Sequence, residues 1–314
     1  MKVVFMGTPE FAVPILQAVH EQYGVDLVVT QPDKKVGRKQ RLQEPPVKIT
    51  AKSLDIPVFQ PDRIKTDYDH IIETQPDIII TAAYGQIIPK EVLFAPPLGA
   101  INVHGSLLPK LRGGAPIQRA IMRGHKETGI TIMYMAMAMD SGDIIAQRSI
   151  PITNEDTTGT LFDKLSLLGR DLLLDTLPSI IDGTAPRIKQ DETQVTYAYN
   201  IKKYEERLDL SRSKDELDCQ LRAFLPEPGC YLKIDDQRLK IYDARVSDKP
   251  LKKEDEALEN GTVVGIEKRF FTIKVKDGYL DIYEVQLAGK IKMPSIQFLN
   301  GAGRKLITLR KVFH

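Results

Sequence analysis

Short apolar runs alternate with amphipathic stretches through the first half of the chain. The apolar runs have the length of buried strands and lie at 2–7, 26–30, 77–83 and 100–104. Between them, apolar residues recur at helical spacing over 9–22, 46–54, 63–74 and 89–94. Strands that are apolar throughout and separated by helices predict a mostly parallel sheet with helices on both faces.

Two further strand patterns follow at 129–135 and 143–152, and a turn containing Asp140-Ser141-Gly142 separates them. The pattern then predicts one long helix from about 158 to 181, which Asp182-Gly183 would end. We therefore expect residues 1–190 to form one α/β domain.

The pattern changes past residue 185, where the chain becomes polar and irregular, and we expect a linker over 191–206. After a predicted helix at 215–224, short alternating segments with Gly, Asp or Lys turns occupy 229–234, 238–246, 261–269, 270–278, 279–287 and 305–313. Such segments are typical of a small antiparallel barrel. We therefore expect a C-terminal β-barrel domain over 207–314.

The composition agrees with two globular domains and excludes several classes. The chain has 314 residues, of which 42% are hydrophobic and 27% charged. It has no apolar run near the roughly 20 residues that span a bilayer, and its first residues predict a strand and a turn rather than a signal peptide. Cys219 and Cys230 fit neither a disulfide framework nor a zinc site. We expect a cytoplasmic protein without a metal.

The charges are distributed unevenly although the net charge is only +2. Five cations and no anion lie between Lys34 and Arg41, and ten Lys or Arg against three acidic residues follow from Lys268. Two basic regions indicate either a polyanionic partner or two solvated surfaces. Charge alone leaves both interpretations open.

Several common catalytic motifs are absent from the sequence. Only Gly7 follows the first predicted strand, so the G-x-G-x-x-G pattern of dinucleotide enzymes is missing. The sequence also lacks a G-x-x-x-x-G-K-[ST] loop, a zinc-ligand spacing and a G-x-S-x-G elbow. NAD chemistry, a P-loop and an activated serine are therefore not expected.

Three polar residues stand where ligands collect in parallel sheets, at the carboxyl ends of strands. Asn102 and His104 are two apart at the end of one strand and so share a face, and Asp140 lies in the turn after another. An amide, an imidazole and a carboxylate suit acyl transfer to an amine, because they can stabilise an oxyanion and move a proton. The alternative is a structural histidine and a turn-forming aspartate.

The segments around these residues resemble a known family. NVHGSLLP at 102–109, RGGAPI at 112–117 and MDSGD at 139–143 resemble the formyltransferases that use 10-formyltetrahydrofolate. The likeness covers nearly the whole chain, and it is closest to the family members that formylate methionyl-tRNA. The segments that carry it are FMGTPEFA, TQPDKKVGRK, PVFQP, AAYGQIIP, ETGITIM, RAFLPEPG and FLNG.

The resemblance implies a Rossmann-like formyltransferase domain followed by an OB-like barrel that binds tRNA, and a role in translation initiation. It implies direct attack of the methionyl α-amine on the formyl donor, without a covalent enzyme intermediate. It implies a cytoplasmic monomer that contacts the acceptor stem. The implied residues are Asn102, His104 and Asp140 for catalysis; Ser106, Leu107, Leu108, Pro109, Tyr84, Gly85 and Ile87 for the folate; and Lys34, Lys35, Arg38, Lys39 and Arg41, in a flexible loop, for tRNA.

Two departures from the family pattern concern the folate pocket and the linker. The turn before Asp140 is rich in methionine over 135–139, and Glu227 stands where relatives often have Trp. Two other functions remain open. One is a formyltransferase for another amine, such as an amino sugar nucleotide or glycinamide ribonucleotide. The other is an RNA-binding protein built on an inactive transferase domain.

Overall fold

The computed structural model describes residues 1–37 and 40–314, which fold into two compact units. The first unit comprises residues 1–117, 127–152 and 160–200, and the second comprises 118–126, 153–159 and 201–314. Two short segments from within the span of the first unit, 118–126 and 153–159, belong to the second unit, which the sequence pattern did not indicate. The domain limits 1–190, 191–206 and 207–314 stay predictions.

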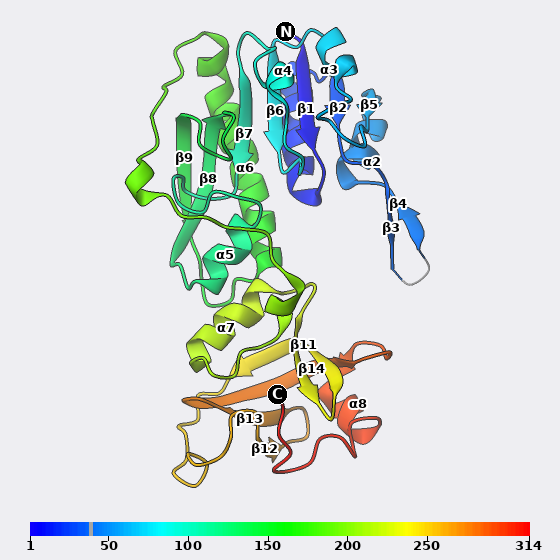
Figure 1. Ribbon diagram of the computed structural model, residues 1–314, viewed down its shortest axis with the longest axis vertical. Helices are drawn as coiled ribbons and strands as arrows, with labels where there is room; N and C mark the ends of the chain where they lie inside the picture. Colours follow the sequence, from blue (N-terminus) through cyan, green and yellow to red (C-terminus); the bar gives the residue numbers. More distant parts are fainter. Residues whose placement is uncertain (38–39) are drawn as a thin grey trace. The chain divides into compact units, whose positions relative to one another are not determined.

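The sheet of the first unit has the strand order β5-β2-β1-β6-β7-β8-β9 (Figure 1). Strands β5 to β7 pair in parallel, whereas β8 is antiparallel to β7 and β9 is antiparallel to β8. The bounds are β1 Val3–Gly7, β2 Leu27–Val29, β5 Val58–Phe59, β6 Ile78–Ala82, β7 Ala100–His104, β8 Glu127–Tyr134 and β9 Ile144–Pro151. The predicted α/β fold with a mostly parallel sheet is confirmed.

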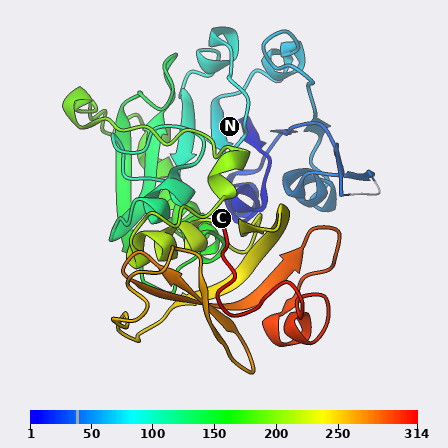
Figure 2. The ribbon, with the colours of Figure 1, turned by 60° about the horizontal axis from the view of Figure 1, so that its bottom comes forward.

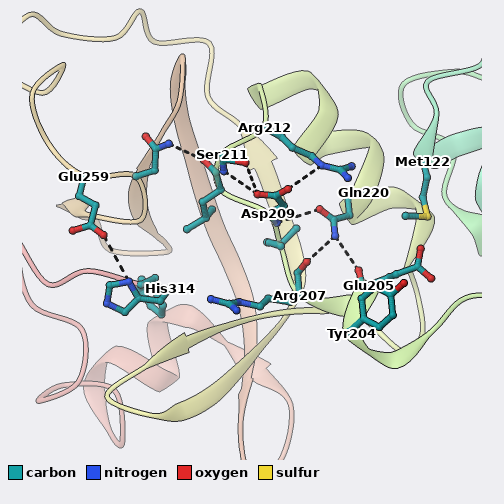
Figure 3. Close-up of a pocket in the computed structure, with 14 residues that line it drawn as sticks. Met122, Tyr204, Glu205, Arg207, Asp209, Ser211, Arg212, Gln220, Glu259 and His314 are labelled. Atoms are coloured by element: carbon teal, nitrogen blue, oxygen red, sulfur yellow. Dashed lines mark hydrogen bonds and ion pairs between the residues drawn. The ribbon is translucent and has the colours of Figure 1, made fainter.

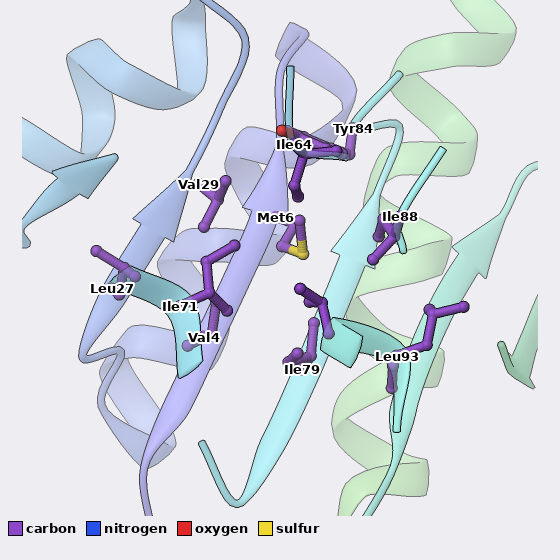
Figure 4. Packing of buried hydrophobic residues seen from close by; sticks show 12 residues of the cluster. Val4, Met6, Leu27, Val29, Ile64, Ile71, Ile79, Tyr84, Ile88 and Leu93 are labelled. Atoms are coloured by element: carbon purple, nitrogen blue, oxygen red, sulfur yellow. The ribbon is translucent and has the colours of Figure 1, made fainter. Parts of the chain in front are cut away.

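Helices cover both faces of this sheet, as apolar strands require. The helical bounds are η1 Glu10–Ala12, α1 Val13–Tyr23, α2 Pro46–Ser53, α3 Asp69–Glu73, α4 Lys90–Leu93, α5 Pro116–Met122, α6 Thr158–Ile181 and η2 Glu192–Gln194. On one face, Val4 and Met6 of β1 pack with Ile71 of α3 and Leu93 of α4 (Figure 4). The helix predicted over 63–74 is therefore only partly correct, because α3 begins at Asp69.

Helix α6 lies close against the other face. A Cβ at Gly169 would come within 2.9 Å of Val103 on β7, so a larger residue there would force α6 away from the sheet. The Ser166 hydroxyl donates to the carbonyl of Phe11 at 2.7 Å and fixes α6 to the segment after β1. The close approach at Gly169 packs α6 directly against β7, the strand that carries Asn102 and His104.

The basic segment after β2, expected to be a flexible loop, contains two short paired strands. Strands β3 (Lys34–Val36) and β4 (Arg41–Gln43) pair in antiparallel register, and their side chains are exposed. At its base, Lys48 bonds Asp33 at 2.8 Å and Glu44 at 3.0 Å. The acidic groups nearest the hairpin are thus already paired.

The second unit contains an antiparallel sheet in the order β10-β11-β14-β13-β12, and β15 also pairs with β14. Figure 2 brings these strands, yellow to orange, toward the viewer. The bounds are η3 Lys203–Glu206, α7 Lys214–Ala223, β10 Cys230–Ile234, β11 Gln237–Val246, β12 Val263–Ile266, β13 Phe271–Val275, β14 Gly278–Leu287, β15 Met293–Pro294 and α8 Ser295–Asn300. The predicted antiparallel C-terminal domain is confirmed, but no pairing in the described residues closes β10 onto β12 as a barrel would.

The strand predicted at 305–313 is wrong. Leu306, Ile307 and Phe313 are buried there, and two adjacent buried residues do not follow the alternation of a strand. The segment forms turns, with one bridge between Thr262 and Val312. Across the described ranges 1–37 and 40–314, no helix is long and apolar enough to cross a membrane.

Candidate active site at the end of strand β7

Asn102 lies near the end of β7, opposite Thr81 of the neighbouring strand β6. The buried Thr81 hydroxyl donates to Asn102 Oδ1 at 2.8 Å. This contact favours one of the two orientations of the amide, in which Oδ1 faces Thr81 and Nδ2 keeps its hydrogens for another acceptor. Thr81 was not predicted as a site residue.

His104 is the last residue of β7, and its side chain is 5% exposed. Its Nε2 lies 3.1 Å from the carbonyl oxygen of Leu111. A carbonyl can only accept, so Nε2 carries a hydrogen and the neutral ring has its lone pair on Nδ1. That Nδ1 lies 3.7 Å from Asp140 Oδ2. The ring nitrogen that carries the lone pair therefore faces the Asp140 carboxylate.

Asp140 has a left-handed backbone conformation with φ of +49°. Asp tolerates this conformation better than most residues. Its Oδ2 accepts a hydrogen bond from the Gly113 N–H at 2.8 Å, and its side chain is 17% exposed. The structure thus brings His104 and Asp140 together at the end of β7, where Asn102 also lies.

The segment expected to contact folate at 106–109 is largely bonded within the protein. The Ser106 hydroxyl donates to the Lys110 carbonyl at 2.7 Å, and Ser106 and Leu108 are buried. Thr131 donates to the Ser106 carbonyl at 2.6 Å and accepts from the Leu108 N–H at 3.1 Å. Leu107 and Pro109 are half-buried and keep some exposed surface for a ligand.

The second expected folate segment, at 84–87, exposes its backbone and Ile87 rather than its tyrosine ring. Tyr84 lies in the core of the first unit (Figure 4), where burial raises the pKa of its hydroxyl. Its hydroxyl finds no hydrogen-bond partner among the described residues. Gly85 is exposed with φ of +88°, and Ile87 is 88% exposed. A ligand could therefore meet Gly85 and Ile87, but not the Tyr84 ring.

Three of the five residues expected to bind tRNA are described, and all three lie on β3 or β4. Lys34, Lys35 and Arg41 are exposed, and Arg41 pairs with Val36 across the hairpin. The Lys34 ammonium donates to Gln31 Oε1 at 2.7 Å. Arg38 and Lys39 lie outside the described residues. The described cations therefore form an exposed basic surface on β3 and β4.

A cavity of about 730 Å³ lies in the second unit, and none of these residues lines it (Figure 3). Carboxylates line its wall: Asp209 contacts Arg212 at 3.4 Å, and Glu259 faces His314 at 3.8 Å. Carboxylates in a wall disfavour a phosphate. Within the part of the chain that the structure describes, no cluster of His, Cys, Asp and Glu could hold a metal ion.

Comparison with known proteins identifies the family. Residues 1–177 match the formyl transferase family, and residues 200–303 match the formyl transferase C-terminal domain. The methionyl-tRNA formyltransferase of Latilactobacillus sakei is 53% identical over 99% of this chain and 97% of its own length. That of Lysinibacillus sphaericus is 51% identical over 97% of both chains.

Solved structures share the fold at lower identity. An N-formyltransferase from Helicobacter canadensis, in complex with folinic acid and dTDP-3-aminofucose, aligns with a TM-score of 0.68. It is 20% identical and covers 90% of this chain and 98% of its own. Because half of the sequence is shared with named relatives along nearly its full length, the chain belongs to the methionyl-tRNA formyltransferases, which are enzymes of the formyl transferase family.

Proposed function

We propose that the chain transfers the formyl group of 10-formyltetrahydrofolate to the α-amino group of methionyl-tRNA, for translation initiation. The observation that carries the proposal is the convergence of His104 Nδ1 and Asp140 Oδ2, 3.7 Å apart, at the end of β7. The relatives at about half identity bear the name of this activity.

The loops around the site suit the formyl donor. Ile87, Met137 and Met139 are exposed apolar side chains in the loops that follow β6 and precede Asp140. Exposed apolar surface of this kind suits the flat ring of a pterin. When bound, 10-formyltetrahydrofolate supplies the formyl carbon that accepts the amine.

Each of the three polar residues has a role in this reaction. Asn102 Nδ2 donates to the formyl oxygen as negative charge develops on it. His104 Nδ1 takes the proton that leaves the attacking amine, directly or through water, and as the imidazolium it also donates to that oxygen. The Asp140 carboxylate stabilises the positive imidazole. The amine nitrogen first bonds to the formyl carbon and gives the oxyanion. The donor's carbon–nitrogen bond then breaks, and the proton passes from His104 to the leaving nitrogen.

The transfer proceeds without a covalent enzyme intermediate. The two serines nearest in sequence are not activated by a base, because the Ser106 hydroxyl donates to the Lys110 carbonyl and the Ser141 hydroxyl to the Ala138 carbonyl. Cys219 and Cys230 lie in the second unit, and burial raises the pKa of both thiols. These features support direct attack by the amine.

The remaining parts of the chain serve the tRNA. Lys34, Lys35 and Arg41, with Arg38 and Lys39, contact phosphates of the acceptor stem. The C-terminal domain over 207–314 adds further contacts, and residues 191–206 link it to the catalytic domain over 1–190. The protein acts as a cytoplasmic monomer.

A formylation assay tests the proposal. Purified protein receives 10-formyltetrahydrofolate with methionyl-tRNA, free methionine or an amino sugar nucleotide, and the assay is repeated with His104→Ala. His70→Ala is the matched control, because His70 belongs to the same unit but is 56% exposed. We expect formylation of the charged tRNA only, lost in His104→Ala and kept in His70→Ala. Formylation of a small amine instead, or of nothing, would overturn the proposal.

A further inference from the structure

The side chain of Gln190 bonds the backbone on both sides of the Asp140 turn. Its Nε2 donates to the carbonyl oxygen of Asp140 and to that of Gly142, each at 2.8 Å. A primary amide has two N–H hydrogens, so both are used here. Gln190 is 50 residues from Asp140 in the sequence, and no pattern in the chain connected the two.

The oxygen of the same amide is held by a buried arginine. Gln190 Oε1 accepts from Arg112 Nε at 3.0 Å and from Nη2 at 2.8 Å. The Arg112 side chain is 4% exposed, and its charge is balanced by Glu192 at 2.8 Å. With donors facing Oε1 and acceptors facing Nε2, only one orientation of the Gln190 amide satisfies its partners.

Arg112 lies between the two residues that contact the proposed catalytic pair. Leu111 supplies the carbonyl that accepts from His104 Nε2, and Gly113 supplies the N–H that donates to Asp140 Oδ2. The Arg112–Gln190 contact therefore ties the Asp140 backbone to the segment that holds His104. The segment 111–113 therefore contacts both proposed catalytic side chains.

The hydrogen bonds from Gln190 stabilise a turn whose backbone conformation is unfavourable. The left-handed conformation is unfavourable for an L-residue, and the surrounding structure must offset its cost. A Cβ at Gly142 would lie 1.9 Å from the Tyr134 carbonyl, so the turn is also pressed against β8. A small displacement of a catalytic group costs a large factor in rate, on the order of 10²-fold for about 1 Å.

We propose that Gln190 is a positioning residue, which holds the Asp140 backbone so that its carboxylate faces His104. The proposal rests on the proposed function of Asp140. A merely structural Gln190 would serve as a partner for buried Arg112, and its loss would then lower stability without acting through Asp140.

Gln190→Glu separates the two roles. Glutamate keeps an acceptor oxygen for Arg112 and strengthens that contact by its charge. It loses both donors to the Asp140 turn and faces two carbonyl oxygens instead. We expect a folded variant whose kcat falls about 10-fold or more, with KM for both substrates within about 2-fold. Gln194→Ala is the control, because Gln194 lies four residues on and donates to Asp191 on the surface.

The same change in an Asp140→Ala background tests whether Gln190 acts through Asp140. We expect no further loss of kcat there, because residues that act as a unit are not additive. An equal loss in both backgrounds, or full activity of Gln190→Glu, would overturn the proposal.

A crystal structure of Gln190→Glu gives a readout that is independent of the assay and of the acceptor. We expect the distance between Asp140 Oδ2 and His104 Nδ1 to exceed the 3.7 Å of the wild type. An unchanged distance and turn would refute the positioning role even if methionyl-tRNA proved to be the wrong acceptor.

Discussion

Replacing Thr81 by Val removes the hydroxyl that donates to Asn102 and keeps the size of the side chain. Thr81 is 2% exposed, so water does not readily take the place of the lost donor. In the wild type, the 2.8 Å contact favours the amide orientation that leaves Asn102 Nδ2 available. Without it, the amide oxygen and nitrogen can exchange places, and part of the population presents an acceptor to the developing oxyanion.

The contact distances set the size of the effect. A hydrogen bond contributes about 0.5–1.5 kcal/mol net, and each 1.4 kcal/mol or so changes a rate about tenfold. The Thr81 hydroxyl has one hydrogen but also lies 3.0 Å from the Ile101 carbonyl and 3.3 Å from Met135 Sδ. Because these acceptors share the hydrogen, we expect the lower half of the range, a loss of about 3-fold in kcat.

Single-turnover formylation of methionyl-tRNA measures this loss. Thr81→Ser keeps the hydroxyl and should retain most of the rate, which separates the hydrogen bond from packing. Asn102→Ala should lower the rate by about 10²–10³, and adding Thr81→Val to it should change nothing more. Wild-type activity in folded Thr81→Val, or an equal loss in Thr81→Ser, would refute the assigned role of the hydroxyl.

Three further predictions concern other parts of the chain. Tyr84→Phe removes a buried hydroxyl without a partner among the described residues, so urea unfolding should show a gain of about 1 kcal/mol; a loss would contradict it. Replacing Lys35 and Arg41 with Gln should reduce the salt dependence of methionyl-tRNA binding, measured as the slope of log K against log salt, by about 2; an unchanged slope would exclude phosphate contacts. The hydrogen bond from Arg119 lowers the pKa of Glu205 from 4.5, so the pair stabilises the fold above that pH and the effect is lost as the pH falls through the lowered pKa. Glu205→Gln should therefore cost about 1–3 kcal/mol at pH 7, and the difference from wild type in urea should shrink below pH 4.5; a difference independent of pH would contradict it.

The parts of the fold that the sequence predicted well are those with a strong local signal. Every residue of Val3–Gly7 and of Ile78–Ala82 is buried, and an apolar run of that length has few alternatives to a core strand. Strand β5 was not predicted, because its two residues carry too little periodicity. Its pairing with β2 comes from the neighbouring strand rather than from its own sequence.

In the candidate site, too, the sequence located the residues with a local signal and missed the others. The two-residue period of a strand placed Asn102 and His104 on one face, and the Asp140-Ser141-Gly142 turn marked the third residue. Thr81 and Gln190 could not be found by such rules. Thr81 is 21 residues from Asn102, and the pairing of β6 with β7 brings the two together. Gln190 is 50 residues from Asp140, and only the path of the chain near Gln190 brings it to the turn.

Leu111 shows that a backbone group can set the protonation of a site residue, which residue types alone do not reveal. The spacing located the His104 imidazole but not which ring nitrogen carries the hydrogen, and that depends on the Leu111 carbonyl. Leu111 has φ of +63°, a conformation that no sequence rule assigns to leucine. Hydrogen bonds from the Leu111 and Arg112 N–H groups to Thr196, both at 2.9 Å, hold it there. A segment 85 residues away thus helps decide that Nδ1, and not Nε2, faces Asp140 and is free to take a proton.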